Sequence, residues 1–161
     1  MDNPLSGWEV LTQCLLPGGL MKVGLYSELA RQHIVKIRKE ISKQGIGSSE
    51  VEIKAFRDRI LSSDKDHHKL VRKSGDFYST STLKDLIFHV QEYRFTIPQI
   101  KDCLSKLGLK FCGFEGKMVR EFKINNTKRG DEYNLDKWQE YEEANPNTFT
   151  GMYQFWCQKV G

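Results

Sequence analysis

Apolar and polar residues along this chain follow two periodicities, one typical of amphipathic helices and one typical of short buried strands. Residues 5–16 repeat apolar side chains every three to four positions, which predicts a helix that ends at the Pro-Gly-Gly sequence of residues 17–19. Leu20–Tyr26 is a short apolar run, which predicts a mostly buried strand. The same reasoning predicts strands over Leu109–Glu115 and Gly151–Val160.

Helix signals fill the intervals between these strands. Ser27 is expected to cap a helix whose apolar positions recur on one face as far as Ile41. Capping boxes, in which Ser or Thr is followed three residues later by Glu or Gln, predict helices after Ser49 and Thr96. The remaining expectations are irregular chain at residues 62–79, a short helix from Thr82, an extended segment at residues 92–95, no clear pattern at residues 116–130 and an acidic helix over residues 135–143.

Three strands separated by helices predict an α/β sheet with crossover connections. The helices between the first and second strands form an insert at about residues 28–95 of a single domain spanning residues 1–161. Three strands make a small core for 161 residues. The pattern therefore favours one part of a larger sheet.

Composition and charge narrow the class of protein. Hydrophobic residues make up 39% and charged residues 29%, which is ordinary for a globular protein. No apolar run approaches the roughly 20 residues needed to cross a bilayer, and the N-terminus lacks a signal-peptide pattern, so no membrane partner and a cytoplasmic location are expected. Residues 22–73 contain thirteen Lys or Arg against seven Asp or Glu. This excess suits an anion- or nucleic-acid-binding face, but its mixing with acids favours solvated helix faces.

Metal-binding and nucleophilic motifs find little support. The four cysteines are scattered, with no C-x-x-C pair, and are expected to be reduced and mostly buried. His67 and His68 are adjacent, so their rings are expected to point apart, and no metal site is predicted. No G-x-S-x-G sequence occurs.

Several segments together resemble a known family. Residues 16–21 read Leu-Pro-Gly-Gly-Leu-Met, between an amphipathic helix and a buried strand. The other segments that carry the resemblance are residues 2–8, 24–31, 76–79, 88–92, 113–115 and 152–156. In this order they resemble a bacterial group of class I S-adenosylmethionine-dependent methyltransferases, some of which carry tetratricopeptide repeats in front. The family commonly has a basic residue where this chain has Leu16.

The resemblance implies the C-terminal half of a Rossmann-like methyltransferase sheet. Leu20–Tyr26, Leu109–Glu115 and Gly151–Val160 would be strands five, six and seven, with seven antiparallel between the other two. Strands one to four would precede residue 1, so the S-adenosylmethionine of the complete enzyme has no expected binding residues in this chain. Gly45-Ile46-Gly47 follows a helix rather than a strand, which argues against a cofactor loop.

Candidate substrate-side residues follow from the same resemblance, with no catalytic residue assigned. They are Tyr26, Ser27, His89, Glu92, Tyr93 and Arg94. Each also has a structural interpretation: Ser27 as a helix cap, Tyr26 as a half-buried aromatic, His89 as a hydrogen-bonded helix residue, and Glu92 with Arg94 as an ion pair that holds the insert.

Three hypotheses remain open from the sequence. The chain is the substrate-side half of a methyltransferase, inactive alone, whose methyl acceptor is unknown. Alternatively, it is a non-catalytic module that pairs with an N-terminal half or partner chain, or it binds anions or nucleic acid through its basic helices. In the first two, an exposed edge at Leu20–Tyr26 would favour self-association.

Overall fold

The computed structural model describes residues 4–88 and 92–161, and these form two compact units. Unit 1 contains Met1–Ala30 and Tyr93–Gly161, and unit 2 contains Arg31–Glu92. Each unit has its own hydrophobic core. None of the helices in the described ranges is long and apolar enough to span a bilayer.

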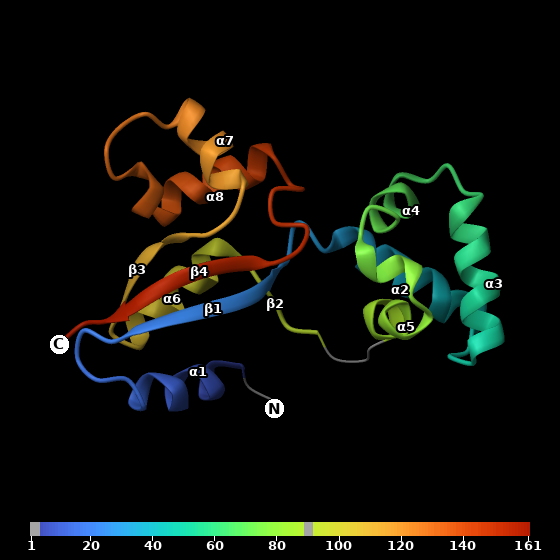
Figure 1. The fold of residues 1–161 in the computed structure, drawn as a ribbon, viewed down its shortest axis with the longest axis horizontal. Helices are drawn as coiled ribbons and strands as arrows, with labels where there is room; N and C mark the ends of the chain where they lie inside the picture. The colour runs from blue at the N-terminus through green and yellow to red at the C-terminus, as the bar shows by residue number, and fades with distance from the viewer. Residues whose placement is uncertain (1–3, 89–91) are drawn as a thin grey trace. The chain divides into compact units, whose positions relative to one another are not determined.

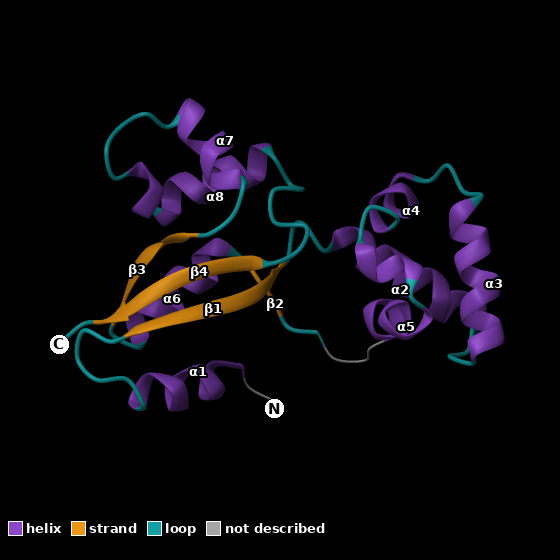
Figure 2. Ribbon diagram, in the orientation of Figure 1, coloured by secondary structure: helices purple, strands orange, loops and turns teal. Residues whose placement is uncertain are grey.

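Unit 1 is an α/β structure and unit 2 is helical (Figures 1 and 2). The elements of unit 1 are α1 (Pro4–Gln13), β1 (Leu20–Ser27), β2 (Arg94–Phe95), α6 (Ile97–Lys106), β3 (Leu109–Phe114), α7 (Met118–Asn125), the 3₁₀-helix η2 (Asp131–Tyr133), α8 (Leu135–Ala144) and β4 (Tyr153–Lys159). Those of unit 2 are α2 (Gln32–Gln44), α3 (Glu50–Leu61), α4 (Asp66–Val71), the 3₁₀-helix η1 (Gly75–Tyr78) and α5 (Thr80–Phe88). The α/β class predicted from the sequence is confirmed.

The sheet of unit 1 has the strand order β2-β1-β4-β3. β4 lies between β1 and β3 and runs antiparallel to both, with Val23 opposite Phe155 and Leu109 opposite Lys159. β1 and β3 therefore run parallel to each other although they do not touch. Such an arrangement requires a crossover between them, and α6 is the helix that leads into β3.

A fourth strand, β2, was not predicted from the sequence. It contains two residues and pairs parallel with the end of β1, Tyr26 opposite Arg94 and Ser27 opposite Phe95. Two residues are too few to show an alternating pattern, although the extended conformation at residues 92–95 was expected. On this side of β1, the part of the chain that the structure describes supplies no strand partner for residues 20–25.

Within unit 1, helices cover one face of the sheet, and no described helix of this unit covers the opposite face, called the open face below. Tyr153, Phe155 and Cys157 of β4 are fully buried, whereas the alternate residues Gln154 and Trp156 are exposed. The covered face packs against α1, α6 and α8, which contribute Trp8, Ile100, Leu104 and Trp138 to a single core. The Trp8 and Phe155 rings lie 6.0 Å apart in an edge-to-face arrangement.

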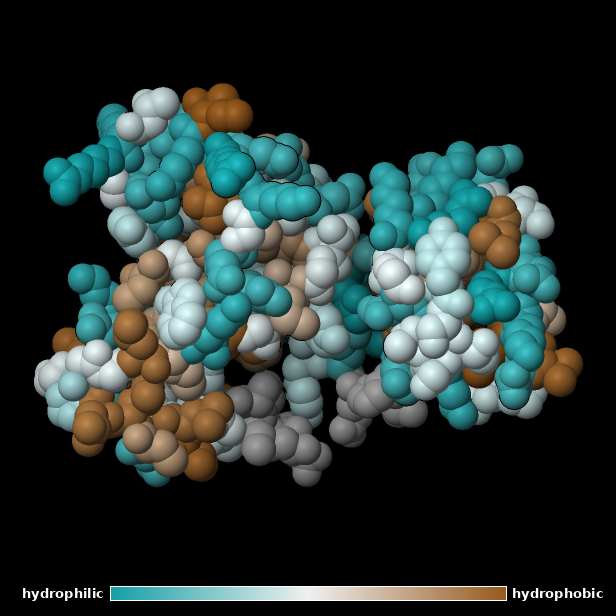
Figure 3. Space-filling view, in the orientation of Figure 1, coloured by the Kyte–Doolittle hydropathy of each residue, from teal (hydrophilic) through white to brown (hydrophobic). Residues whose placement is uncertain are grey.

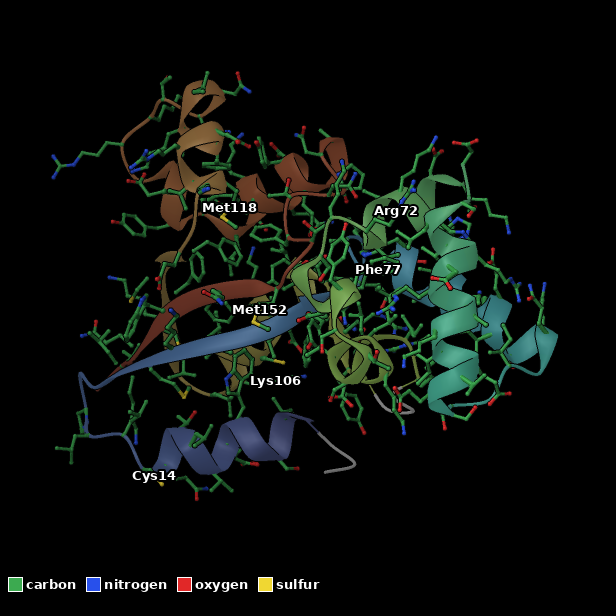
Figure 4. All side chains as sticks on the ribbon, turned by 45° about the vertical axis from the view of Figure 1, so that its right-hand side comes forward. Cys14, Arg72, Phe77, Lys106, Met118 and Met152 are labelled. Atoms are coloured by element: carbon green, nitrogen blue, oxygen red, sulfur yellow. The ribbon has the colours of Figure 1, made fainter. Side chains whose placement is uncertain are left out.

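The open face carries both polar and apolar side chains. Lys22 forms an ion pair with Glu115 at 2.9 Å, and the indole N–H of Trp156 donates to the same carboxylate. Met152 covers Gly24, because a Cβ atom at Gly24 would lie 3.0 Å from the Met152 sulfur (Figure 4). A helix or another chain packed here would bury Trp156, which is 41% exposed.

Helix α2 begins later than the sequence predicts. β1 continues through Ser27, and the next residues form a turn, so α2 starts at Gln32 rather than near residue 28. Ser27 therefore does not cap the helix, but its hydroxyl accepts a hydrogen bond from the backbone N–H of Ala30 within the turn. The helix ends at Gly45, whose φ of 62° is a left-handed conformation that glycine adopts without strain.

Unit 2 packs five short helical segments around Ile34, Ile37, Ile60, Phe77 and neighbouring apolar residues (Figure 4). The capping box predicted at Ser49 is present. The segment at residues 62–79, expected to be irregular, instead contains α4 and η1. These helices have six and four residues, so neither is long enough to show a helical hydrophobic repeat.

Candidate functional site

The carboxyl end of β1 gathers polar residues of unit 1. Tyr26 and Ser27 are the last residues of β1, and Arg94 lies beside Tyr26 on β2. The Arg94 Nε donates to Glu28 at 2.9 Å. Arg94 forms an ion pair with Glu28, and Glu92 forms one with Arg31. The ion pair expected between Glu92 and Arg94 stays a prediction.

A buried hydrogen-bond cluster joins β1, α8 and β4 below this end. The Ser27 hydroxyl donates to Glu142 Oε1 at 2.6 Å, and the Tyr153 hydroxyl lies 2.7 Å from Glu142 Oε2. Ser27 and Tyr153 are completely buried and Glu142 is 1% exposed. Glu142 is thus out of reach of a ligand on the surface, and its role is to fix the positions of Ser27 and Tyr153.

Burial dominates the electrostatics of this cluster. It raises the pKa of Glu142 above its ordinary value, although the hydrogen bonds from Ser27 and Tyr153 act in the opposite direction. Burial likewise raises the pKa of the Tyr153 hydroxyl, and the nearby Glu142 adds to the effect. The cluster therefore favours the neutral forms of both groups.

Glu92 belongs to a different ion-pair network, which joins the first and last residues of unit 2. Its carboxylate accepts hydrogen bonds from Arg31 at 2.6 and 3.2 Å and from Arg38 at 3.1 Å. Burial raises the pKa of Glu92, but the two guanidinium groups outweigh it and hold that pKa below its ordinary value. The first and last residues of unit 2 are thus joined by an ion pair whose side chains are 7% and 5% exposed.

A third cluster lies on α2 and α4. The Nε2 atoms of His67 and His68 lie 2.8 and 2.9 Å from the two oxygens of Glu40, and the Lys65 ammonium also bonds this carboxylate at 2.8 Å. The expectation that the rings point apart is wrong: their centroids are 4.5 Å apart. Burial opposes ionisation of Glu40, but the three donors lower its pKa to about 2.

The structure brings together some of the residues predicted for the site and not others. Tyr26 and Ser27 end β1, Arg94 pairs with Tyr26 from β2, and Tyr93, which precedes Arg94, is 42% exposed. Glu92 belongs to unit 2. His89 lies outside the described residues. Whether any of these residues contacts a substrate remains a prediction.

Sequence reasoning missed Glu142, because α8 carries several acids that resemble solvated residues. A signal was nonetheless present: Leu135, Trp138 and Glu142 recur at three and four residues, which places Glu142 on the apolar face of the helix. Tyr153 was likewise detectable, since it alternates with Phe155 on the buried side of β4.

Part of the basic character of residues 22–73 is compensated by ion pairs in the described structure. Six of the thirteen basic residues form ion pairs with Asp or Glu: Lys22, Arg31, Arg38, Lys54, Lys65 and Lys69. Paired charges leave a weaker field for a nucleic acid. These ion pairs are typical of solvated helix faces, and binding of an anion or nucleic acid through these helices stays a prediction.

Comparisons with known proteins bear on the fold. No family model matches the chain. It is 25% identical over 157 residues to the uncharacterized protein syc1184_c of Synechococcus sp. (strain ATCC 27144 / PCC 6301 / SAUG 1402/1), covering 88% of this chain and 36% of that protein. The structure of PKMT2 from Rickettsia typhi aligns with a TM-score of 0.62 and 13% identity, over 95% of this chain and 31% of that chain. The chain thus spans about one third of the length of both proteins.

Proposed function

We propose that this chain is the substrate-side half of a class I S-adenosylmethionine-dependent methyltransferase, and that a separate half binds the cofactor. The observation that carries the proposal is the sheet order, with β4 antiparallel between the parallel strands β1 and β3. Under this proposal β1, β3 and β4 are strands five, six and seven of the family. The structural likeness to PKMT2, a protein lysine methyltransferase, supports a methyltransferase-like fold.

The unpaired edge of β1 supports the idea of a half. Among the described residues, 20–25 have a strand partner only on the β4 side, and β2 pairs with Tyr26 and Ser27 alone. An edge strand of this length offers unpaired N–H and C=O groups to another strand. In a complete doubly wound sheet, a parallel strand would occupy this edge.

Two exposed surfaces of unit 1 also support the proposal that another part of the enzyme packs against this chain. Helices cover both faces of a mostly parallel α/β sheet, but here the face that bears Trp156 is open. Hydrophobic residues also gather over α1 and the start of β1, at the lower left of Figure 3. Those exposed in this region are Val10, Leu11, Leu16 and Leu20. Large exposed apolar patches commonly mark interaction sites.

The carboxyl end of β1 is where the acceptor would bind, because ligands of open α/β sheets bind beyond the carboxyl ends of the strands. Tyr26 and the Glu28–Arg94 ion pair offer hydrogen-bonding and charged groups there. Ser27 directs its hydroxyl to Glu142, so its role is to fix the end of the strand. Correct placement of the acceptor is itself a large part of catalysis.

Calorimetric titration with S-adenosylmethionine and S-adenosylhomocysteine tests the proposal. We expect no binding by the chain alone. Micromolar binding would show that the chain contains a cofactor site and would refute the proposal that it is only the substrate-side half. The chain would then be mixed with the part of the Synechococcus protein that it does not match. Recovery of S-adenosylhomocysteine binding in the mixture is expected, and failure of a folded mixture to bind it would contradict the proposal.

A matched pair of variants tests whether the two halves associate through the open face of the sheet. Trp156→Ser alters the open face of the sheet and should weaken association of the two parts by about tenfold, the effect of losing one well-packed aromatic contact. Val51→Ser alters an apolar residue of unit 2 that is 78% exposed, and should leave association unchanged. Equal effects of the two substitutions would show that the open face is not where the two parts associate.

A further inference from the structure

We propose that Glu40, His67 and His68 form a binding site for a divalent transition metal, with Zn²⁺ as the best match. Two imidazole nitrogens and one carboxylate are a common ligand set for zinc, with water in the fourth position. The site lies within unit 2 and does not depend on the methyltransferase proposal.

The ligand atoms are already close enough to share one ion. One nitrogen from each ring and one carboxylate oxygen all lie within 4.8 Å of one another. Tetrahedral zinc with bonds of about 2.0 Å separates its ligands by roughly 3.3 Å. The histidine nitrogens now lie 2.8 and 2.9 Å from the two Glu40 oxygens, so an ion would move these atoms slightly apart and bring any pair near the 4.8 Å limit closer by up to about 1.5 Å.

Packing holds the two rings in this arrangement. His68 lies edge-on to Phe56, with 6.5 Å between ring centroids, and His67 lies edge-on to His68. The side chains of His67 and His68 are 17% and 5% exposed, and that of Glu40 is 20% exposed. Ligands that are fixed before binding lose little conformational entropy when the ion arrives.

A shallow hollow leads to the cluster. It is lined by Glu40, Phe56, Asp58, Arg59, Ser62, Ser63, Lys65 and His68. This hollow gives water and ions access to Glu40 and His68 from one side. It supplies the open coordination position that three protein ligands leave.

The second nitrogen of His68 gives independent support. Nδ1 is buried and has no hydrogen-bond partner among the described residues. Buried polar atoms normally have partners, and each exception calls for an explanation. The bond to Glu40 places the ring proton on Nε2 in the metal-free protein, and an ion that takes the Nε2 lone pair moves this proton to Nδ1, which has no competing partner. Because metal-bound histidines usually donate this second N–H, we expect micromolar rather than nanomolar affinity.

Lys65 distinguishes a metal site from a simple ion-pair cluster. Its ammonium bonds Glu40 Oε1, where it competes with a cation for the carboxylate. Its side chain is 55% exposed, so it can move into solvent. Lys65→Met should therefore strengthen metal binding about tenfold, because it removes a positive charge beside the ligand.

The test uses the full chain and two metals. Titration with Zn²⁺, followed by calorimetry, should give saturable binding of one ion and raise the melting temperature of unit 2, because ligands of the folded state stabilise it. Titration with Co²⁺ should give the visible absorption of nitrogen and oxygen ligands without a thiolate band. The absence of the thiolate band excludes binding by Cys14, which is exposed.

Variants assign the ligands. Glu40→Gln and His67→Gln should each weaken Zn²⁺ binding by at least about tenfold. Glu50→Gln, which alters an exposed carboxylate paired with Lys54 on α3, should leave it unchanged. Circular dichroism checks that each variant is folded. The proposal fails if folded wild type shows no saturable binding at millimolar metal, if only Cys14→Ser removes binding, or if Lys65→Met does not strengthen it.

Discussion

Replacing Glu142 by alanine tests the buried cluster of unit 1 most directly. The substitution leaves the hydroxyls of Ser27 and Tyr153 without their acceptor, and both side chains are completely buried. An unsatisfied buried polar group costs about 1–3 kcal/mol, and the cavity left by the side chain adds to this. We therefore expect the free energy of unfolding of unit 1 to fall by about 3–5 kcal/mol.

Replacing Glu142 by glutamine separates the hydrogen bonds from the charge. Glutamine keeps an acceptor oxygen at nearly the same position and is neutral at every pH. The folded pKa of Glu142 is raised above its unfolded value, so its protonation stabilises the fold below about pH 4.5, and this contribution is lost as pH rises through the folded pKa. The difference in stability between Glu142→Gln and wild type should accordingly shift in favour of the variant as pH rises from 4.5 to 8.

Urea unfolding monitored by tryptophan fluorescence is the appropriate assay. All three tryptophans, Trp8, Trp138 and Trp156, lie in unit 1, so the signal reports this unit and not the helical unit. Equal destabilisation by Glu142→Ala and Glu142→Gln, with no change in the pH dependence for the glutamine variant, would refute the role assigned to the buried carboxyl.

Two further predictions concern unit 2, and far-UV circular dichroism during urea unfolding measures both. Glu92→Gln should destabilise this unit by about 3 kcal/mol, because it removes the charge that compensates Arg31 and Arg38; a loss below about 1 kcal/mol would show that the pair is effectively solvated. Gly45→Ala should cost about 1 kcal/mol, since φ at Gly45 is 62° although the space around it is free. Gly75→Ala is the control, because Gly75 has equal space and no positive φ; equal costs at the two positions would contradict this explanation.

Local signals in the sequence predicted the parts of the fold that local interactions determine. Strands β1, β3 and β4 and the capping boxes at Ser49 and Thr96 all lie where the pattern placed them. Among the elements that were missed, β2, α4 and η1 are too short to show a period. The contacts within the candidate sites were harder to predict from the sequence, because the hydrogen bonds from Ser27 to Glu142 and from His68 to Glu40 join residues 115 and 28 positions apart. Such contacts depend on tertiary packing, which a period of two or 3.6 does not record.

The entry and exit of unit 2 occur at nearly the same point of the chain's path. In unit 1, Ser27 of β1 pairs with Phe95 of β2, and the backbone N–H of Glu28 donates to the Phe95 carbonyl at 2.8 Å. Within unit 2, Arg31 and Glu92 form an ion pair at 2.6 Å. Because each unit has a core of its own, we expect a short glycine-containing link in place of residues 31–92 to leave β1 and β2 in register. Over evolution, an insertion point of this kind would let a protein gain, lose or replace a helical unit without changing the strand order of the sheet.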